Sequence, residues 1–163
     1  MAAYDPEAWT DLFVAAAGAS AALAGLVFVA VSINVERILQ YEGLPERSLQ
    51  TLMLLVSVLI VSIIGLIPGQ DRIVLGVELF ICGLAFGLAI WSRGVRSTDP
   101  STAGALAIDR IALTLLGTLP FVAGGLSLLA ETGGGLYWIV AGIVFATLGA
   151  VANAWVLLVE ILR

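Results

Sequence analysis

Five long apolar stretches occupy most of this 163-residue chain, and they limit what it can fold into. The hydrocarbon core of a bilayer is about 30 Å thick, and a helix crosses it in about 20 apolar residues. Soluble helices carry a polar face, which these stretches lack, so a water-soluble bundle is disfavoured. The stretches are Leu12 to Val35, Thr51 to Gly69, Ile73 to Ser92, Ile111 to Ala130 and Gly135 to Val159.

The stretches predict an all-α fold, an integral membrane bundle of five transmembrane helices within a single domain over 1–163. The loops are too short to hold a soluble domain. The N-terminal residues lack the basic region of a cleavable signal peptide, so the first stretch is expected to remain a membrane helix. Turn signals such as Pro68-Gly69 and Gly133-Gly134-Gly135 separate the helices. The helices are predicted at about 9–39, 46–67, 71–93, 103–131 and 135–162.

The arginines predict the orientation of the bundle. With the N-terminus outside, six of the seven basic residues fall on the cytoplasmic side, as the positive-inside rule favours, and only Arg72 lies outside. The C-terminus is then cytoplasmic. Trp9, Tyr137 and Trp138 would mark the outer membrane interface, and Tyr41 and Trp91 the inner one. We therefore expect a multi-pass protein of the inner (plasma) membrane.

The composition excludes several kinds of function. The chain has no His, no Lys and one cysteine, Cys82, so zinc sites, His-ligated haem and His-based acid–base catalysis are not expected. No glycine-rich phosphate loop with its lysine is present, and no paired carboxylates lie at one depth. The formal charge of −5 gives no support for a nucleic-acid partner. We expect a protein that is not an enzyme and holds no cofactor or metal, and the absence of Lys beside many Ala and Gly suggests a GC-rich prokaryotic genome.

The first predicted helix is unusually rich in small residues. Gly18 and Ala22, and likewise Ala21 and Gly25, are four residues apart, which places each pair on one helix face where backbones can approach closely. Small residues surround much of this helix. Two placements fit equally: the middle of a monomeric bundle, or the axis of an oligomer where several copies meet.

A second face of the same helix carries two polar residues with apolar residues between them. At about 100° per residue, Ser20, Val27, Val31 and Asn34 fall near one line. Such a face could form a hydrophobic constriction that gates by dewetting. Ordinary helix packing, with Asn34 bonded to a neighbour, is the alternative and the more common outcome.

Two polar residues lie inside later apolar stretches. Glu78 lies about two turns into the third helix, where an ionisable group faces a cavity or a partner. It is a candidate ion or proton site, and the alternative is that it snorkels to the interface or pairs with Arg72. Asn153 lies well inside the fifth helix and is a second candidate, with a hydrogen bond across helices as its structural alternative.

The first helix resembles the pore helix of the Orai family of calcium channels. The resemblance rests on a Ser-Ala-x-Leu-small-Gly run from Ser20 to Gly25 and on the Val-Ala step that follows. It implies a homo-oligomer with this helix around a central pore. The position of the family's selectivity glutamate is Ile33 here, so calcium selectivity is not implied. By this resemblance the axis-facing residues are Gly18, Ala22, Gly25, Leu26, Val29 and Ile33.

Three functions therefore stay open at the level of sequence. The first is a homo-oligomeric ion channel or pore lined by the first helix, with Ser20 and Asn34 added to the residues above as pore-lining candidates. The second is a non-catalytic membrane scaffold or accessory subunit that packs against a partner membrane protein. The third is a small-solute transporter that uses Glu78 and Asn153 in an internal cavity. The overall pattern also resembles small bacterial polytopic membrane proteins to which no activity is assigned.

Overall fold

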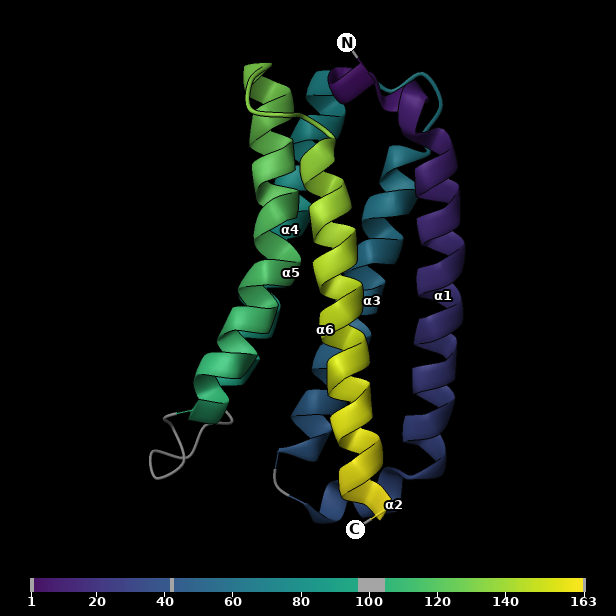
Figure 1. Ribbon diagram of the computed structural model, residues 1–163, viewed down its shortest axis with the longest axis vertical. Coiled ribbons are helices and arrows are strands. Elements are labelled where there is room, and N and C mark those ends of the chain that lie inside the picture. The colour runs from purple at the N-terminus through teal and green to yellow at the C-terminus, as the bar shows by residue number, and fades with distance from the viewer. Residues whose placement is uncertain (1, 42, 97–104, 163) are drawn as a thin grey trace.

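The computed structural model describes residues 2–41, 43–96 and 105–162, and all of its regular elements are helices (Figure 1). This confirms the predicted all-α class. Two short 3₁₀ helices, η1 (Ala2–Tyr4) and η2 (Pro6–Trp9), precede the α-helices. The α-helices are α1 (Thr10–Ile33), α2 (Val35–Gln40), α3 (Leu44–Gly65), α4 (Arg72–Arg96), α5 (Ala105–Ala130) and α6 (Tyr137–Leu162).

Four helical segments among the described residues are long and apolar enough to cross a membrane. They are Pro6–Ile33, Leu44–Gly65, Arg72–Ser92 and Tyr137–Val159. The remaining long helix, α5, has 26 residues, and its part from Leu115 to Ala130 is apolar. The predicted start of this helix at 103 lies outside the described residues, as does Arg163 at the C-terminus. The apolar helices fit a membrane-embedded bundle.

Helix α3 lies at the centre of the bundle, and α1 lies at its edge. Helix α3 packs against α1, α4 and α6, while α5 packs against α4 and α6, so that α3 to α6 form a ring (Figure 1). Helix α1 packs mainly on α3, outside that ring. The placement of the first helix in the middle of a monomeric bundle is therefore wrong for the single chain.

The first predicted helix is also shorter than 9–39. Helix α1 ends at Ile33, and Asn34 leaves the helical conformation with φ of −107° and ψ of 14° before α2 begins. The Asn34 side-chain amide donates to the Ala30 carbonyl oxygen at 2.8 Å. Asparagine favours such local bonds at helix ends, where it competes with the continuing helix. The remaining residues of the predicted helix form the short α2.

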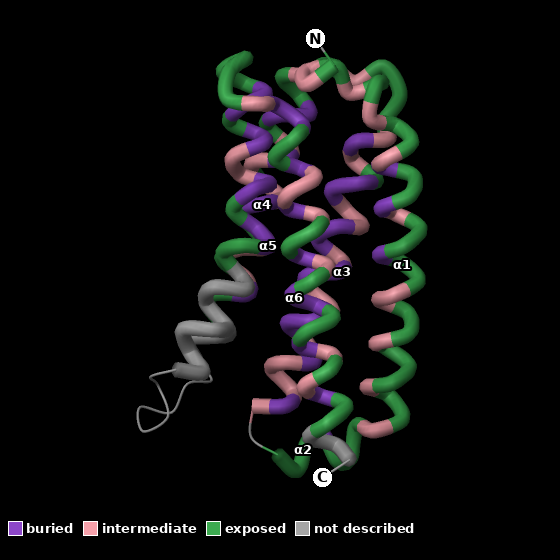
Figure 2. Tube along the Cα trace, in the orientation of Figure 1, coloured by how far each residue is buried: buried purple, intermediate pink, exposed green. Residues whose placement is uncertain are grey.

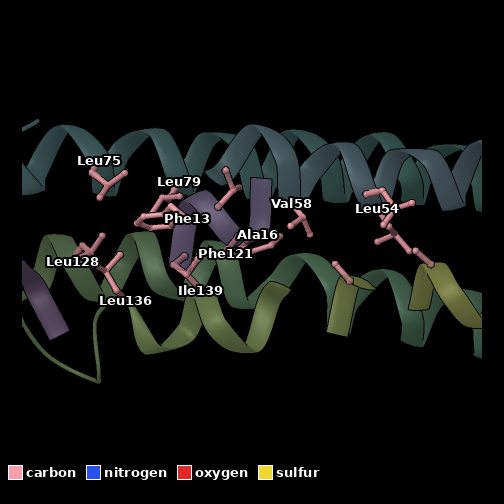
Figure 3. Close-up of a cluster of buried hydrophobic side chains, with 14 of the residues drawn as sticks. Phe13, Ala16, Leu54, Val58, Leu75, Leu79, Phe121, Leu128, Leu136 and Ile139 are labelled. Atoms are coloured by element: carbon pink, nitrogen blue, oxygen red, sulfur yellow. The ribbon is translucent and has the colours of Figure 1, made fainter. Parts of the chain in front are cut away.

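Phe13 anchors α1 to the centre of the bundle. Its side chain is fully buried in one apolar cluster with Val58, Phe121 and Ile139 (Figure 3). The ring lies directly over Gly65 at the end of α3, where an added Cβ would come within 2.6 Å of it. The absence of a side chain at Gly65 therefore makes room for the aromatic ring, a form of close packing that membrane bundles favour.

An N-terminal strap, defined here as residues 2–9, ties α1 to the turn between α5 and α6. The Leu136 backbone N–H donates to the Ala3 carbonyl oxygen at 2.8 Å, and the Gly134 N–H donates to the Tyr4 hydroxyl at 3.3 Å. Within the strap, the Trp9 indole N–H donates to the Ala2 carbonyl oxygen at 2.6 Å. The strap crosses the end of the bundle where the N-terminus lies (Figure 1). It gives α1 a second point of attachment besides α3.

Candidate functional site

Helix α1 has an inner face that packs on the bundle. Phe13, Ala16 and Ser20 are buried, and Val27 packs against the same apolar cluster. The predicted gating face, formed by Ser20, Val27, Val31 and Asn34, is this inner face: Ser20 is only 2% exposed, and the other three are partly buried. In the single chain it is a packing surface between helices, as the alternative predicted, but Asn34 donates to Ala30 of its own helix and not to a neighbouring one.

The outer face of α1 is unpartnered in the single chain. Leu26 is 69% exposed and Ile33 is 77% exposed, and Figure 2 shows the outer side of α1 coloured as exposed along its length. An added Cβ at Gly18 or Gly25 would meet nothing within 4 Å. We call this surface the α1 outer face. Its members are Gly18, Ala22, Gly25, Leu26, Val29 and Ile33, all of them exposed.

The pore-lining candidates therefore divide into two groups. The six residues that the resemblance to calcium channels predicts to face a pore axis all lie on the α1 outer face. Ser20 and Asn34 do not belong to it, because they lie about half a helical turn away. The structure brings the first group together on one surface and separates it from the second.

Polar side chains of the spanning helices mostly bond to their own backbone. The Ser20 hydroxyl donates to the Ala16 carbonyl oxygen at 2.7 Å, and the Ser32 hydroxyl donates to the Phe28 carbonyl oxygen at 2.8 Å. In α3, the Thr51 hydroxyl donates to the Arg47 carbonyl oxygen at 2.8 Å. Such bonds satisfy a hydroxyl within its own helix and leave less of its hydrogen-bonding capacity for a substrate.

Glu78 is held by a partner that the sequence did not suggest. Its carboxylate accepts a hydrogen bond from the side-chain amide of Gln70, which lies in the turn before α4. Arg72, the expected alternative partner, instead forms an ion pair with Glu131 at 2.5 Å. The pairing of Glu78 with Arg72 is therefore wrong. Glutamate and glutamine eight residues apart are brought together by the turn geometry between α3 and α4, which the sequence spacing does not reveal.

The pair between Arg72 and Glu131 connects the start of α4 to the end of α5. The hydrogen bond from the Arg72 guanidinium lowers the pKa of the Glu131 carboxyl, and the positive charge acts in the same direction. Glu131 is well exposed, which limits the strength of the pair because water and salt screen it. This contact stabilises the end of the bundle and does not form a buried ionic site.

Glu78 and Asn153 lie at different depths. Glu78 is six residues after the start of α4, while Asn153 is sixteen residues after the start of α6, and both helices start at the same end of the bundle (Figure 1). At 1.5 Å per residue the two side chains differ by about 15 Å along the bundle. A single internal site that uses both residues, as the transporter hypothesis requires, is therefore not formed.

A hollow of about 330 Å³ lies at the N-terminal end of the bundle. Residues of the strap and of the turn between α3 and α4 line it, including Glu7, Thr10, Pro68 and Gln70. It is far from Asn153 and lies between the strap and the turn. Within the described residues, no three or more Cys, Asp or Glu side chains gather into a group that could hold a metal ion.

These features define the class of protein as a helical bundle fit for a membrane, in which α1 exposes a face of small and apolar residues. Comparison with protein-family models, with curated proteins and with solved structures found no match. The α1 outer face is therefore the candidate functional site on its own geometry.

Proposed function

We propose that this chain is a non-catalytic subunit of a homo-oligomeric membrane assembly, held together through the α1 outer face. The observation that carries the proposal is the exposure of that face while the opposite face of α1 is packed on α3. In water, an amphipathic helix packs its apolar face on the protein and exposes its polar face. The exposed face of α1 is instead made of small and apolar residues, so contact with water does not explain its exposure.

The small side chains favour another helix as the occupant of this face. Lipid chains and apolar side chains are equally apolar, so helices associate in membranes through close backbone approach and dispersion contacts. Gly18, Ala22 and Gly25 leave the α1 backbone open to such an approach. A second copy of the same face is complementary to it, because each copy offers the small residues that the other needs.

Native mass spectrometry of the full chain in mild detergent tests this proposal. We expect wild type to be oligomeric, and Gly25→Leu to shift it toward the monomer, because leucine keeps the backbones apart. Ala152→Leu is the matched control, since Ala152 is exposed on α6 and lies outside the α1 outer face. A monomeric wild type, or an oligomer that both variants leave unchanged, would contradict the proposal.

A pore lined by α1 is a second candidate. It is supported by the position of all six axis-facing residues of the channel resemblance on the α1 outer face. Leu26, Val29 and Ile33 would make such an axis apolar, and an apolar axis conducts only when it becomes wetted. The pore therefore predicts that Val29→Ser raises conductance in planar bilayers. The absence of conductance in both wild type and Val29→Ser, for an intact oligomer, contradicts the pore and leaves the assembly role.

A further inference from the structure

The hollow at the N-terminal end of the bundle joins segments that are far apart in the sequence. Its volume of about 330 Å³ is at the lower end of the range for small-molecule pockets. The strap, the start of α1 and the turn between α3 and α4 surround it, and Figure 1 shows that turn beside the strap. The lining residues are Pro6, Glu7, Thr10 and the run from Gly65 to Gln70.

The C-terminal end of α3 leaves backbone acceptors at this hollow. Among the described residues, no backbone N–H donates to the carbonyl oxygens of Gly65, Leu66 and Ile67. Pro68 has no N–H to offer and cannot continue the helix. Carbonyl oxygens point toward the C-terminal end of a helix, where the macrodipole leaves a partial negative charge. The end of α3 therefore favours a hydrogen-bond donor or a cation in the hollow.

The lining side chains of the strap and of α1 add further acceptors. The Glu7 carboxylate can only accept hydrogen bonds. The Thr10 hydroxyl donates to the Glu7 carbonyl oxygen at 2.9 Å, so its oxygen is left as an acceptor. The N–H groups of Leu66 and Ile67 already donate to the carbonyl oxygens of the preceding helical turn. The lining thus offers a ligand more acceptors than donors.

The charge around the hollow has one sign. Of the described residues that line it, none is basic and only Glu7 is acidic. Arg72, just after the lining run, is held in its ion pair with Glu131. A second carboxylate, that of Glu78, lies behind the wall, bonded to the Gln70 amide. A single lining carboxylate is too little for a metal ion, and the volume exceeds what a bare ion needs, so an organic cation fits better.

We propose that the hollow binds the ammonium group of a primary amine, with its carbon chain against the apolar wall of Pro6, Ile67 and Pro68. Such a group has three donors and no acceptor, which complements the lining. Glu7 is exposed and by itself would hold a cation weakly, so the carbonyl oxygens of α3 are needed as well. The site shares no residue with the α1 outer face and does not rest on the proposed assembly.

Thermal unfolding in detergent tests the site with n-butylammonium as the probe. The matched probes are 1-butanol, which lacks the charge, and tetramethylammonium, which lacks the donors. We expect butylammonium alone to raise the melting temperature in a saturable way. Glu7→Gln should weaken its binding about tenfold, because a charge-assisted bond is lost. Asp11→Asn removes the same charge from an exposed residue of α1 outside the hollow, and should weaken it less than twofold.

Two results would overturn the proposal. The first is a melting temperature that butylammonium does not raise, or that butanol raises equally. The second is equal weakening in Glu7→Gln and Asp11→Asn, which would mean that the probe only screens the charge of this end of the bundle.

A free amine and the ethanolamine headgroup of a lipid both carry a primary ammonium, and nanodiscs distinguish them. A lipid ligand would compete with the probe, so butylammonium would bind wild type more weakly in phosphatidylethanolamine than in phosphatidylcholine, whose headgroup has no N–H donor. Equal binding in the two lipids would identify a free amine as the ligand. Absence of butylammonium binding in both lipids would overturn the site.

Discussion

Gly135 is the residue on which the N-terminal strap depends most directly. Its φ of +57° lies in the left-handed region, and an added Cβ would overlap the carbonyl oxygen of Ala3. We predict that Gly135→Ala detaches the strap and destabilises the chain by about 2 kcal/mol, as overpacking does elsewhere. Detachment also separates the Trp9 ring from Tyr137, now 4.8 Å away, so Trp fluorescence in detergent reports it during thermal unfolding.

The control for this prediction is Gly133→Ala. Gly133 has a φ of +85°, and its added Cβ would come no nearer than 3.5 Å to another group. Both variants carry the strain of alanine in a left-handed conformation, so the excess effect of Gly135→Ala measures the overlap with Ala3. Equal losses in the two variants would mean that the strap contact contributes nothing.

The ion pair between Arg72 and Glu131 predicts a pH dependence. Because the folded pKa of Glu131 is lowered, the pair stabilises the fold above the ordinary glutamate pKa and is lost as the pH falls through the folded value. We expect wild type to melt at a slightly higher temperature than Glu131→Gln at pH 7, with the difference shrinking as the pH falls below the ordinary glutamate pKa. A difference that stays constant as the carboxyl is protonated in acid would contradict this assignment. Because the pair is exposed, added salt should also reduce the difference.

Single residues show which features of the structure could be predicted from the sequence and which could not. Pro68 and Gly69 stop a helix by their own backbone chemistry, so the turn between α3 and α4 was predictable. The hydrogen-bond partner of Glu78 was not predictable, because several residues lie close to it in sequence. Only the geometry of the turn brings the Gln70 side chain to its carboxylate. The strap contacts of Tyr4 and Ala3 join residues about 130 positions apart, a separation at which one sequence carries no pairing signal.

At the scale of elements, the helices were predictable and their neighbours were not. Length and apolarity decide whether a segment can cross a bilayer, and both are local properties. The position of a helix within the bundle is harder to predict. In lipid, buried and exposed helix faces are both apolar, whereas in water the exposed face is polar. Helix α1 therefore looked suited to a central place, although it lies at the edge of the single chain. It would become central only in an oligomer whose copies meet at the α1 outer face.

Phe13 and Phe28 test the attachment of α1 to the bundle. Phe13 is fully buried against Gly65, while Phe28 on the same helix is 62% exposed. We predict that Phe13→Ala lowers the free energy of unfolding by about 3 kcal/mol, because it empties a packed site. Phe28→Ala should change it by less than about 0.5 kcal/mol. Unfolding in mixed micelles of rising SDS fraction measures both, and equal losses would show that α1 is not anchored through its inner face.

For the whole molecule, charge divides unevenly between the two ends of the bundle. Six carboxylates lie at the end where the N-terminus is, against one arginine, while the acidic and basic residues of the rest of the chain balance. The formal charge of −5 therefore belongs to one end. The orientation with that end outside stays a prediction, because the positive-inside rule rests on the arginines and not on this net charge.

Assembly of several copies through the α1 outer face is a proposal, and cysteine cross-linking in native membranes tests it most directly. In a Cys82→Ala background, we expect Ala22→Cys to form a disulfide-linked dimer under mild oxidation, because two α1 outer faces bring these positions close enough for a disulfide. Ala152→Cys on the exposed side of α6 should stay monomeric. No cross-link at Ala22, or an equal yield at Ala152, would contradict assembly through the α1 outer face.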